Sequence, residues 1–134
     1  MKGFLKRHWR KIVGAAVTLP VVAFVVLCLV IGSSVRGAVS AAQERHPGGP
    51  TEALLAVAQD EDLGLSERNR AIWALGQLGS PEALPVLEAM VTANGCDHAN
   101  RICQYELEKA IAGCAGGTNA GAWIWRHGDL AVAD

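Results

Sequence analysis

The sequence predicts an all-α protein: an N-terminal transmembrane helix followed by a short right-handed α-solenoid of about two to three helical hairpins. The first observation is the uncharged apolar run IVGAAVTLPVVAFVVLCLVI at residues 12–31. The second is the helical spacing of apolar residues beyond residue 50, where they recur every three or four positions. The third is an internal repeat, because residues 52–78 align with residues 88–114, apolar on apolar, at an offset of 36 residues.

The charges are segregated along the chain. The first eleven residues contain five Lys or Arg and no acidic residue, whereas from residue 48 onward twelve Asp or Glu outnumber five Lys or Arg. The C-terminal part therefore carries a net charge of about −7 at neutral pH. Nucleic-acid-binding proteins carry basic patches, so we expect no nucleic acid among the partners.

Residues 12–34 are predicted to form the transmembrane helix, preceded by a basic tail at residues 1–11. Twenty helical residues reach about 30 Å, the thickness of the hydrocarbon core of a bilayer. Pro20 lies inside the run, and spanning helices tolerate proline when the freed carbonyl finds another partner. A signal peptide cleaved near residues 38–40 is the alternative, although its apolar region is usually about 7–15 residues long.

The basic residues also predict the orientation of the span. Five of them precede the apolar run and few follow it, which favours a cytoplasmic N-terminus. We therefore expect a single-pass protein of the cell membrane, held by a signal anchor. The rest of the chain is expected to form a periplasmic or extracellular domain.

Residues 35–50 are expected to form a juxtamembrane helix and linker, or to extend the membrane helix as far as the helix-stopping sequence HPGGP. The helical-repeat domain is expected over residues 51–134. Thr51 is the expected N-cap of its first helix and Ser66 of its second. Short polar side chains suit this position because they accept hydrogen bonds from the first backbone N–H groups.

The stretch AIWALGQLGSPEALPVLEAMV at residues 71–91 is predicted to form two helices joined by a tight turn. Gly79 suits a left-handed C-cap at the end of the first helix. Ser80 followed by Pro81 suits the start of the second, where proline lacks only an N–H that would be unpaired anyway. Pro85 removes a backbone hydrogen bond early in the second helix and is expected to bend it.

The same stretch resembles a known family. The sequences ALGQLG at residues 74–79 and PEALP at 81–85, with the acidic loop at 60–62, are similar to the HEAT-like repeat of the phycobilisome lyase type. The resemblance is good over residues 60–92 and weaker over 93–114. The C-terminal sequence NAGAWIWRHG is loosely similar to the Trp-bearing segment that closes such arrays. The family implies stacked helical hairpins that present one long surface for protein contact.

The resulting hypothesis is a membrane-anchored adaptor or scaffold that mediates protein–protein interaction outside the cytoplasm, with an unidentified protein as partner. The repeat motif carries no chemistry, and the sequence shows no catalytic triad, phosphate loop or paired carboxylates. We therefore expect neither an enzyme nor a cofactor. Trp73 and Trp125 are the candidate partner-contact residues. The alternatives are packing on a neighbouring helix for Trp73, and closure of the C-terminal end of the array for Trp125 together with Trp123.

The cysteines suggest an alternative function, a small disulfide- or zinc-dependent module. Cys96 and Cys103 are candidates for a disulfide, whereas Cys103 and Cys114 are expected about 16 Å apart on one helix, too far for a bond. The sequence CDHANRIC also offers Cys96, His98 and Cys103 to a zinc ion, but a reliable fourth ligand is missing. Disulfide, free thiols and metal all stay open, and Cys114 is expected to be a buried thiol.

Overall fold

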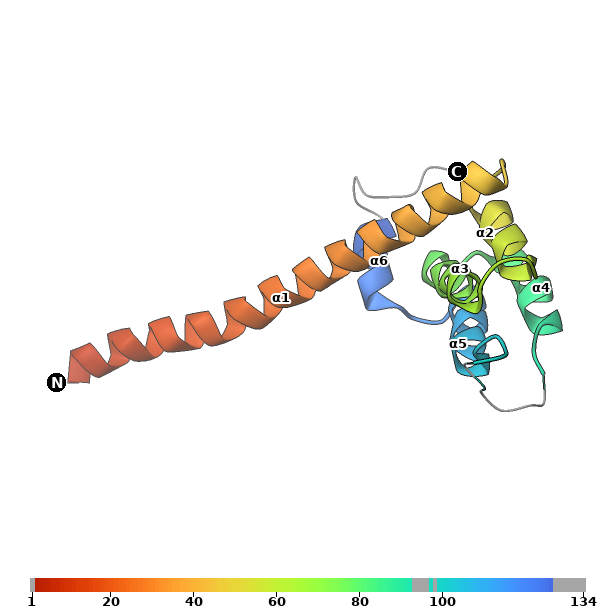
Figure 1. Cartoon of the computed structure of the whole chain (residues 1–134). Helices are drawn as coiled ribbons and strands as arrows, with labels where there is room; N and C mark the ends of the chain where they lie inside the picture. Colours follow the sequence, from red (N-terminus) through yellow and green to blue (C-terminus); the bar gives the residue numbers. More distant parts are fainter. Residues whose placement is uncertain (1, 93–96, 98, 127–134) are drawn as a thin grey trace.

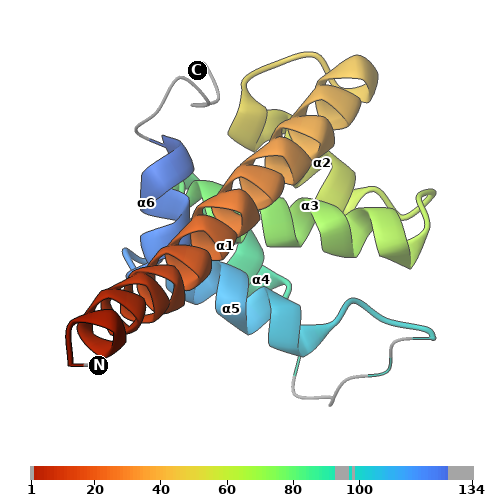
Figure 2. The same cartoon turned by 90° about the vertical axis from the view of Figure 1, so that its left-hand side faces the viewer.

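The structure, a computed structural model, describes residues 2–92, 97 and 99–126, and every regular element in this part of the chain is helical. The all-α prediction is therefore confirmed. Figure 1 shows α1 as a long rod whose C-terminal part lies against the other helices, and Figure 2 views this rod from its N-terminal end. In chain order the elements are α1 (Lys2–Arg45), α2 (Pro50–Gln59), α3 (Leu65–Leu78), the 3-10 helix η1 (Pro81–Ala83), α4 (Leu84–Ala89), α5 (Gln104–Cys114) and α6 (Ala120–Arg126).

α1 continues without a break from the apolar run through residues 33–45 (Figure 1). It contains Pro20 and ends at Arg45, directly before the helix-stopping residues that follow. Of the two alternatives for this region, extension of the apolar helix is the one that the structure adopts. The extension buries one stripe of residues at spacings of three or four, as an amphipathic helix does: Val35, Ala38, Val39 and Ala42.

The predicted N-caps of the second and third helices are wrong by a few residues. α2 begins at Pro50 with Gly49 as its N-cap, and α3 begins at Leu65 with Gly64 as its N-cap. Proline at the first position of α2 explains the earlier start, since its fixed φ suits a helix. The hydroxyl of Thr51 lies 2.8 Å from that of Ser80 and so links α2 to the turn before η1.

The turn after α3 forms as predicted. Gly79 has φ 66° and ψ 37°, and its N–H donates to the carbonyl of Leu75. These left-handed angles favour glycine. Ser80 is the N-cap of η1 and Pro81 its first residue, although the Ser80 side chain makes no capping hydrogen bond. Pro85 lies at the start of α4, so the second helix of this pair divides into a 3-10 turn and a short α-helix.

α3 is the central helix of the packed region, since it contacts α1, α2, α5 and α6. Large apolar side chains from α1 to α6 meet in this region and are almost completely buried. They provide most of the hydrophobic stabilisation. The largest of them are Trp125, Leu54, Ile72, Leu75, Leu87, Leu107 and Val35.

α3 and α5 are packed most closely where small residues meet. A Cβ atom added at Gly76 would lie 2.7 Å from the Cα of Ala110, and one added at Gly113 would lie 2.5 Å from the carbonyl oxygen of Gly76. The helices end at Leu78 and Cys114, the two positions that the 36-residue offset aligns. The repeat deduced from the sequence therefore corresponds to two neighbouring helices of the fold.

α6 joins α1 to α3. On the α1 side, a Cβ atom added at Gly32 would lie 2.9 Å from the Cβ of Trp125, so only glycine allows this approach. On the α3 side, the guanidinium of Arg126 donates through Nε, at 2.8 Å, and through Nη2 to the carbonyl of Gln77. This carbonyl belongs to the last turn of α3, where a cation is favourable and the helix has no internal donor.

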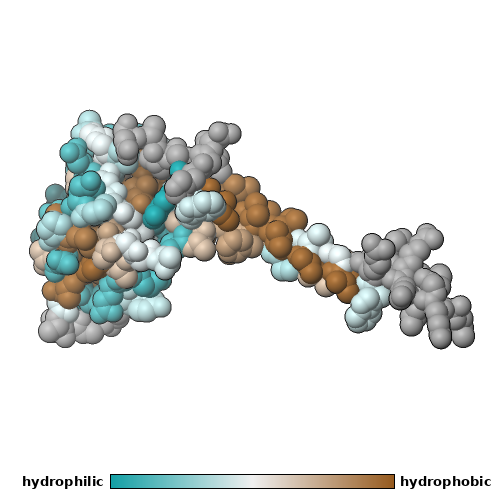
Figure 3. Space-filling model, turned by 180° about the vertical axis from the view of Figure 1, so that it is seen from behind, coloured by the Kyte–Doolittle hydropathy of each residue, from teal (hydrophilic) through white to brown (hydrophobic). Residues whose placement is uncertain are grey.

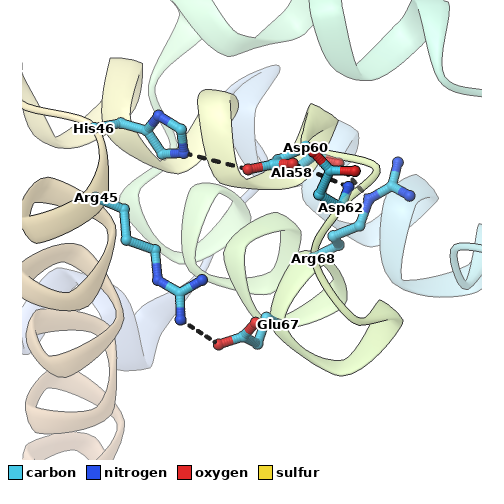
Figure 4. Close-up of polar contacts among 7 residues, drawn as sticks. All are labelled: Arg45, His46, Ala58, Asp60, Asp62, Glu67 and Arg68. Carbon is cyan, nitrogen blue, oxygen red and sulfur yellow. Dashed lines mark hydrogen bonds and ion pairs between the residues drawn. The ribbon is translucent and has the colours of Figure 1, made fainter.

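Polar contacts hold the junction between α1, α2 and α3 (Figure 4). Arg45 at the end of α1 pairs with Glu67 of α3 at 3.0 Å, and the imidazole of His46 lies 3.6 Å from the carboxylate of Asp60. The Nε of Arg68 donates to the carbonyl of Ala58 at 3.0 Å. Exposed ion pairs contribute at most about 1 kcal/mol each, so these contacts set geometry more than stability.

Candidate functional site

A groove of about 360 Å³ lies between α3, α5 and the segment before α6. Trp73 forms part of its wall and also packs against the hydrophobic core. The other lining residues are Gly76, Gln77, Glu106, Lys109, Ala110, Ala112, Gly113, Gly117, Thr118, Asn119 and Ala120. Four of the lining residues are Gly or Ala in α3 and α5, so short side chains leave this space open. We name it the Trp73 groove.

The Trp73 groove combines one aromatic face with fixed polar groups. Lys109 and Glu106 form an ion pair at 3.1 Å, and the Lys109 ammonium also lies 4.8 Å from the centre of the Tyr105 ring. The side-chain amide of Asn119 donates to that of Gln77 at 3.1 Å. An apolar wall with a few oriented polar groups suits one anchoring side chain or a short segment of a partner.

The two predicted contact residues differ in where the structure places them. Trp73 is half-buried: it packs against the hydrophobic core and also lines the groove, and its role in partner contact stays a prediction. Trp125 is only 1% exposed and packs against α1. This burial is compatible with the second interpretation, closure of the C-terminal end of the array, which stays a prediction. Trp123, two residues earlier, is 63% exposed.

The apolar part of α1 is the second candidate site. The structure contains a helix long and apolar enough to cross a membrane, at Ile12–Arg45. A signal sequence passes the same test, and so does the core helix of a soluble protein. A core helix is mostly buried, whereas only 6% of the most apolar window of this one is buried. Figure 3 shows this apolar surface as the brown rod that leaves the packed region.

The cysteines that the structure describes are Cys28, Cys103 and Cys114, and all three are buried. No two of them are joined by a disulfide. Cys96 lies outside the described residues, so the Cys96–Cys103 pairing stays a prediction. Cys103 is the N-cap residue of α5, and its N–H donates to the side-chain oxygen of Asn69 at 3.0 Å.

Cys114 is a buried thiol at the end of α5, as predicted. Its Sγ lies 3.4 Å from the carbonyl oxygen of Leu75. The residue as a whole is 2% exposed. Burial raises the pKa of this thiol, and the nearby Arg126 guanidinium opposes that shift. The thiol is therefore kept protonated, which makes it a poor nucleophile and a poor metal ligand.

The proposed zinc ligands are only partly described. Cys96 and His98 lie outside the described residues, and the part of the chain that is described has no group of three metal-binding side chains. The carboxylate of Asp97, between them in the sequence, accepts hydrogen bonds from the Asn100 side chain and the Ala99 N–H. These bonds hold the pKa of Asp97 below its usual value, with Asn100 as the main cause. This carboxylate organises a turn.

Comparison with known proteins identifies one repeat. Residues 67–92 match the PBS lyase HEAT-like repeat. The match covers most of α3 together with η1 and α4, so the resemblance noted in the sequence is confirmed there. No curated protein and no solved structure matches the chain. The finding supports a helical-repeat protein, a class that commonly mediates protein interaction.

Sequence reasoning missed the residues that assemble these sites. Gly32, Gly76 and Gly113 allow close helix contacts, and a glycine inside a helical pattern is the signal that indicates such an approach. Arg126 and Asn119 contact Gln77 across more than 40 positions of the sequence. A single sequence contains no signal for such a long-range polar contact.

Proposed function

We propose that this protein is a membrane-anchored helical-repeat adaptor that binds a partner protein in the Trp73 groove. The observation that carries the proposal is an exposed apolar helix that runs, without a linker, into a domain containing a HEAT-like repeat. Soluble proteins rarely expose apolar patches larger than a few hundred Å², so a long exposed apolar rod favours a lipid environment.

The extent of the exposed rod supports a transmembrane helix. Large apolar side chains are exposed from Ile12 to Val30 and become buried or half-buried from Ile31 onward. Nineteen helical residues reach about 28 Å, close to the hydrocarbon thickness of a bilayer. The basic residues before the span favour a cytoplasmic N-terminus and a domain outside the cytoplasm.

The groove supports binding rather than catalysis. Its polar side chains are the Glu106–Lys109 ion pair, the hydrogen-bonded amides of Gln77 and Asn119, and the hydroxyl of Thr118. Such groups recognise and orient a ligand, whereas acid–base catalysis requires a titrating group directed at the reacting atom. The aromatic wall at Trp73 supplies the apolar anchor that protein interfaces favour.

Position-specific photocrosslinking in native membranes tests the partner site. A photoreactive amino acid at Ala112, exposed on the groove wall, is expected to yield one discrete protein adduct. The same probe at Glu88, exposed on α4 and absent from the groove wall, is the matched control and is expected to yield none. A Trp73→Ala change in the Ala112 probe variant is expected to reduce the adduct. Equal adducts from both probe positions, or none from either, would contradict the proposal.

The orientation has its own test. A reporter enzyme that is active only after export, fused after Asp134, is expected to be active. A reporter that works only in the cytoplasm is expected to be inactive at the same position. The reverse pattern would place the domain in the cytoplasm and would remove the oxidising environment that a Cys96–Cys103 disulfide needs.

A further inference from the structure

α6 runs alongside the end of the apolar rod and in the same direction. A Cβ atom added at Gly121 would lie 3.5 Å from the Sγ of Cys28, and one added at Gly32 would lie 2.9 Å from the Cβ of Trp125. The contacts therefore advance by four residues on both helices. Figures 1 and 2 both show α6 beside α1, at the point where α1 meets the packed region.

This contact lies at the level where a bilayer ends. If the exposed rod begins to cross the hydrocarbon at Ile12, about 30 Å of helix is used at residue 31. Cys28 and Gly32 lie on either side of that level, and α6 lies next to them. α6 is therefore at the height of the lipid headgroups when α1 spans the membrane.

The side chains of α6 are of the kind found at a membrane–water interface. Trp123 is 63% exposed, although Trp125 on the same short helix is 1% exposed. Tryptophan is enriched at membrane–water interfaces because its ring is apolar and its N–H is polar. The sequence around it agrees, since residues 110–125 contain no charged residue within an otherwise acidic domain.

α6 is also held firmly against the domain. The side-chain oxygen of Asn119 accepts a hydrogen bond from the Ala122 N–H at 3.0 Å, and its amide donates to Gln77 at 3.1 Å. Arg126 donates to the Gln77 carbonyl from the other end of the helix. These hydrogen bonds fix the position of α6 relative to α3 and to the Trp73 groove.

We propose that α6 lies in the headgroup layer of the bilayer that α1 crosses, with Trp123 inserted among the lipids. The domain then has two contacts with the same membrane, one spanning and one interfacial, and its groove is held at a fixed height and orientation. This inference rests on the proposed membrane span. The occupant is lipid because α6 contacts α1 at the point where the exposed apolar surface of α1 ends, so the exposed Trp123 lies at the proposed membrane surface.

Quenching of tryptophan fluorescence by brominated lipids tests the inference on the full chain. The chain is reconstituted into phosphatidylcholine vesicles whose bromine atoms lie on the acyl chains close to the headgroups. Trp9→Phe is included in every variant, because Trp9 lies near the other end of the span. In this background, W9F/W123F is expected to lose most of the quenching shown by W9F. The matched control W9F/W73F is expected to keep it.

The outcomes separate this inference from the proposed span. If the chain floats with the vesicles and W9F/W123F is quenched as strongly as W9F, Trp123 does not contact lipid and the inference is wrong. If none of the variants floats with the vesicles, both the span and the inference are wrong. Thermal melting by circular dichroism checks folding, and the exposed position of Trp123 predicts that W9F/W123F melts like W9F.

Discussion

Residues 12–30 and residues 31–45 belong to one unbroken helix but have opposite surroundings. The first part exposes large apolar side chains on all sides. The second buries a single stripe of mostly small residues against α2, α3 and α6, and exposes small and charged residues on the other side. The comparison shows that helix propensity alone does not decide where a helix belongs. The distribution of apolar residues around the helix axis determines which part of the helix packs in the protein interior.

The two parts also differ in what can stabilise them. In the second part, Val35 and its neighbours gain free energy by leaving water for the protein interior. In the first part, the described residues leave the apolar side chains almost uncovered, and the proposed membrane span would surround them with lipid. On the proposed span, one continuous helix connects the membrane directly to the packed domain. A substitution in the first part is then expected to change membrane insertion, and one in the second part to change folding stability.

A charge in the packed part should have the largest effect. Val35 is completely buried, so Val35→Asp places an unpaired carboxylate in the core and should cost more than about 4 kcal/mol of folding free energy. Urea unfolding of the full chain in detergent micelles, followed by tryptophan fluorescence, measures this loss. Ser40→Asp, at an exposed position of the same helix segment, is the control and should change stability by less than about 0.5 kcal/mol.

Core truncations should come next in size. Leu75 and Leu87 are completely buried in α3 and α4, and either one changed to Ala should cost about 2–5 kcal/mol. The same unfolding experiment applies, with the exposed Val91→Ala as control. Losses below about 1 kcal/mol at both leucines would mean that these helices do not share the core that the structure shows.

A charge in the exposed part should weaken membrane insertion of the helix and leave the folding stability of the domain unchanged. Val22 is 58% exposed, so Val22→Arg should keep the unfolding free energy of the domain. It should cost about 2.5–3.5 kcal/mol of membrane insertion, because Arg then lies near the bilayer centre. The fraction of chain in carbonate-washed membranes measures this effect. Destabilisation of the domain by Val22→Arg, with insertion unchanged, would reverse the assignment of the two parts.

The smallest effect concerns the thiol at the end of α5. Burial raises the pKa of Cys114 above its ordinary value of 9.0, so the folded state retains a proton that the unfolded state loses. The resulting stability is complete below pH 9 and is lost as the pH rises through the higher folded value. Cys114→Ala should remove this dependence, which urea unfolding at pH 8 and pH 10 measures. An unchanged pH dependence in the variant would assign it to another group.

Local patterns in the sequence were sufficient for much of this architecture. The sequence GSP predicted the break between α3 and η1, and the 36-residue offset predicted that α3 and α5 correspond. The N-caps at Thr51 and Ser66 were wrong because glycines adopted the capping conformation earlier. The contact of α6 with α1 was not predicted, since it depends on the absence of a side chain at Gly32 and on a partner far along the chain.

The candidate site was likewise predicted only in part from the sequence. The sequence identified Trp73 as a candidate contact residue, and the structure places it on the wall of the groove. The groove itself was not predicted, because its walls come from α5 and from the segment before α6, which meet α3 only in three dimensions. The zinc and disulfide hypotheses depend on Cys96, which lies outside the described residues, and they stay predictions.

Water accessibility along α1 tests the central claim most directly. Single cysteines are placed from residue 12 to residue 45 in the full chain, with the native cysteines replaced, and labelled in native membranes with a membrane-impermeant maleimide. The two-part helix predicts no labelling at residues 12–30, whichever side of the helix they occupy. Beyond residue 31 it predicts labelling at Ser33, Gly37, Ser40, Ala41 and Glu44 and protection at Val35, Ala38, Val39 and Ala42. Gly32 is left unchanged because a side chain there would displace Trp125. Uniform labelling beyond residue 31, or labelling throughout residues 12–30, would contradict the account.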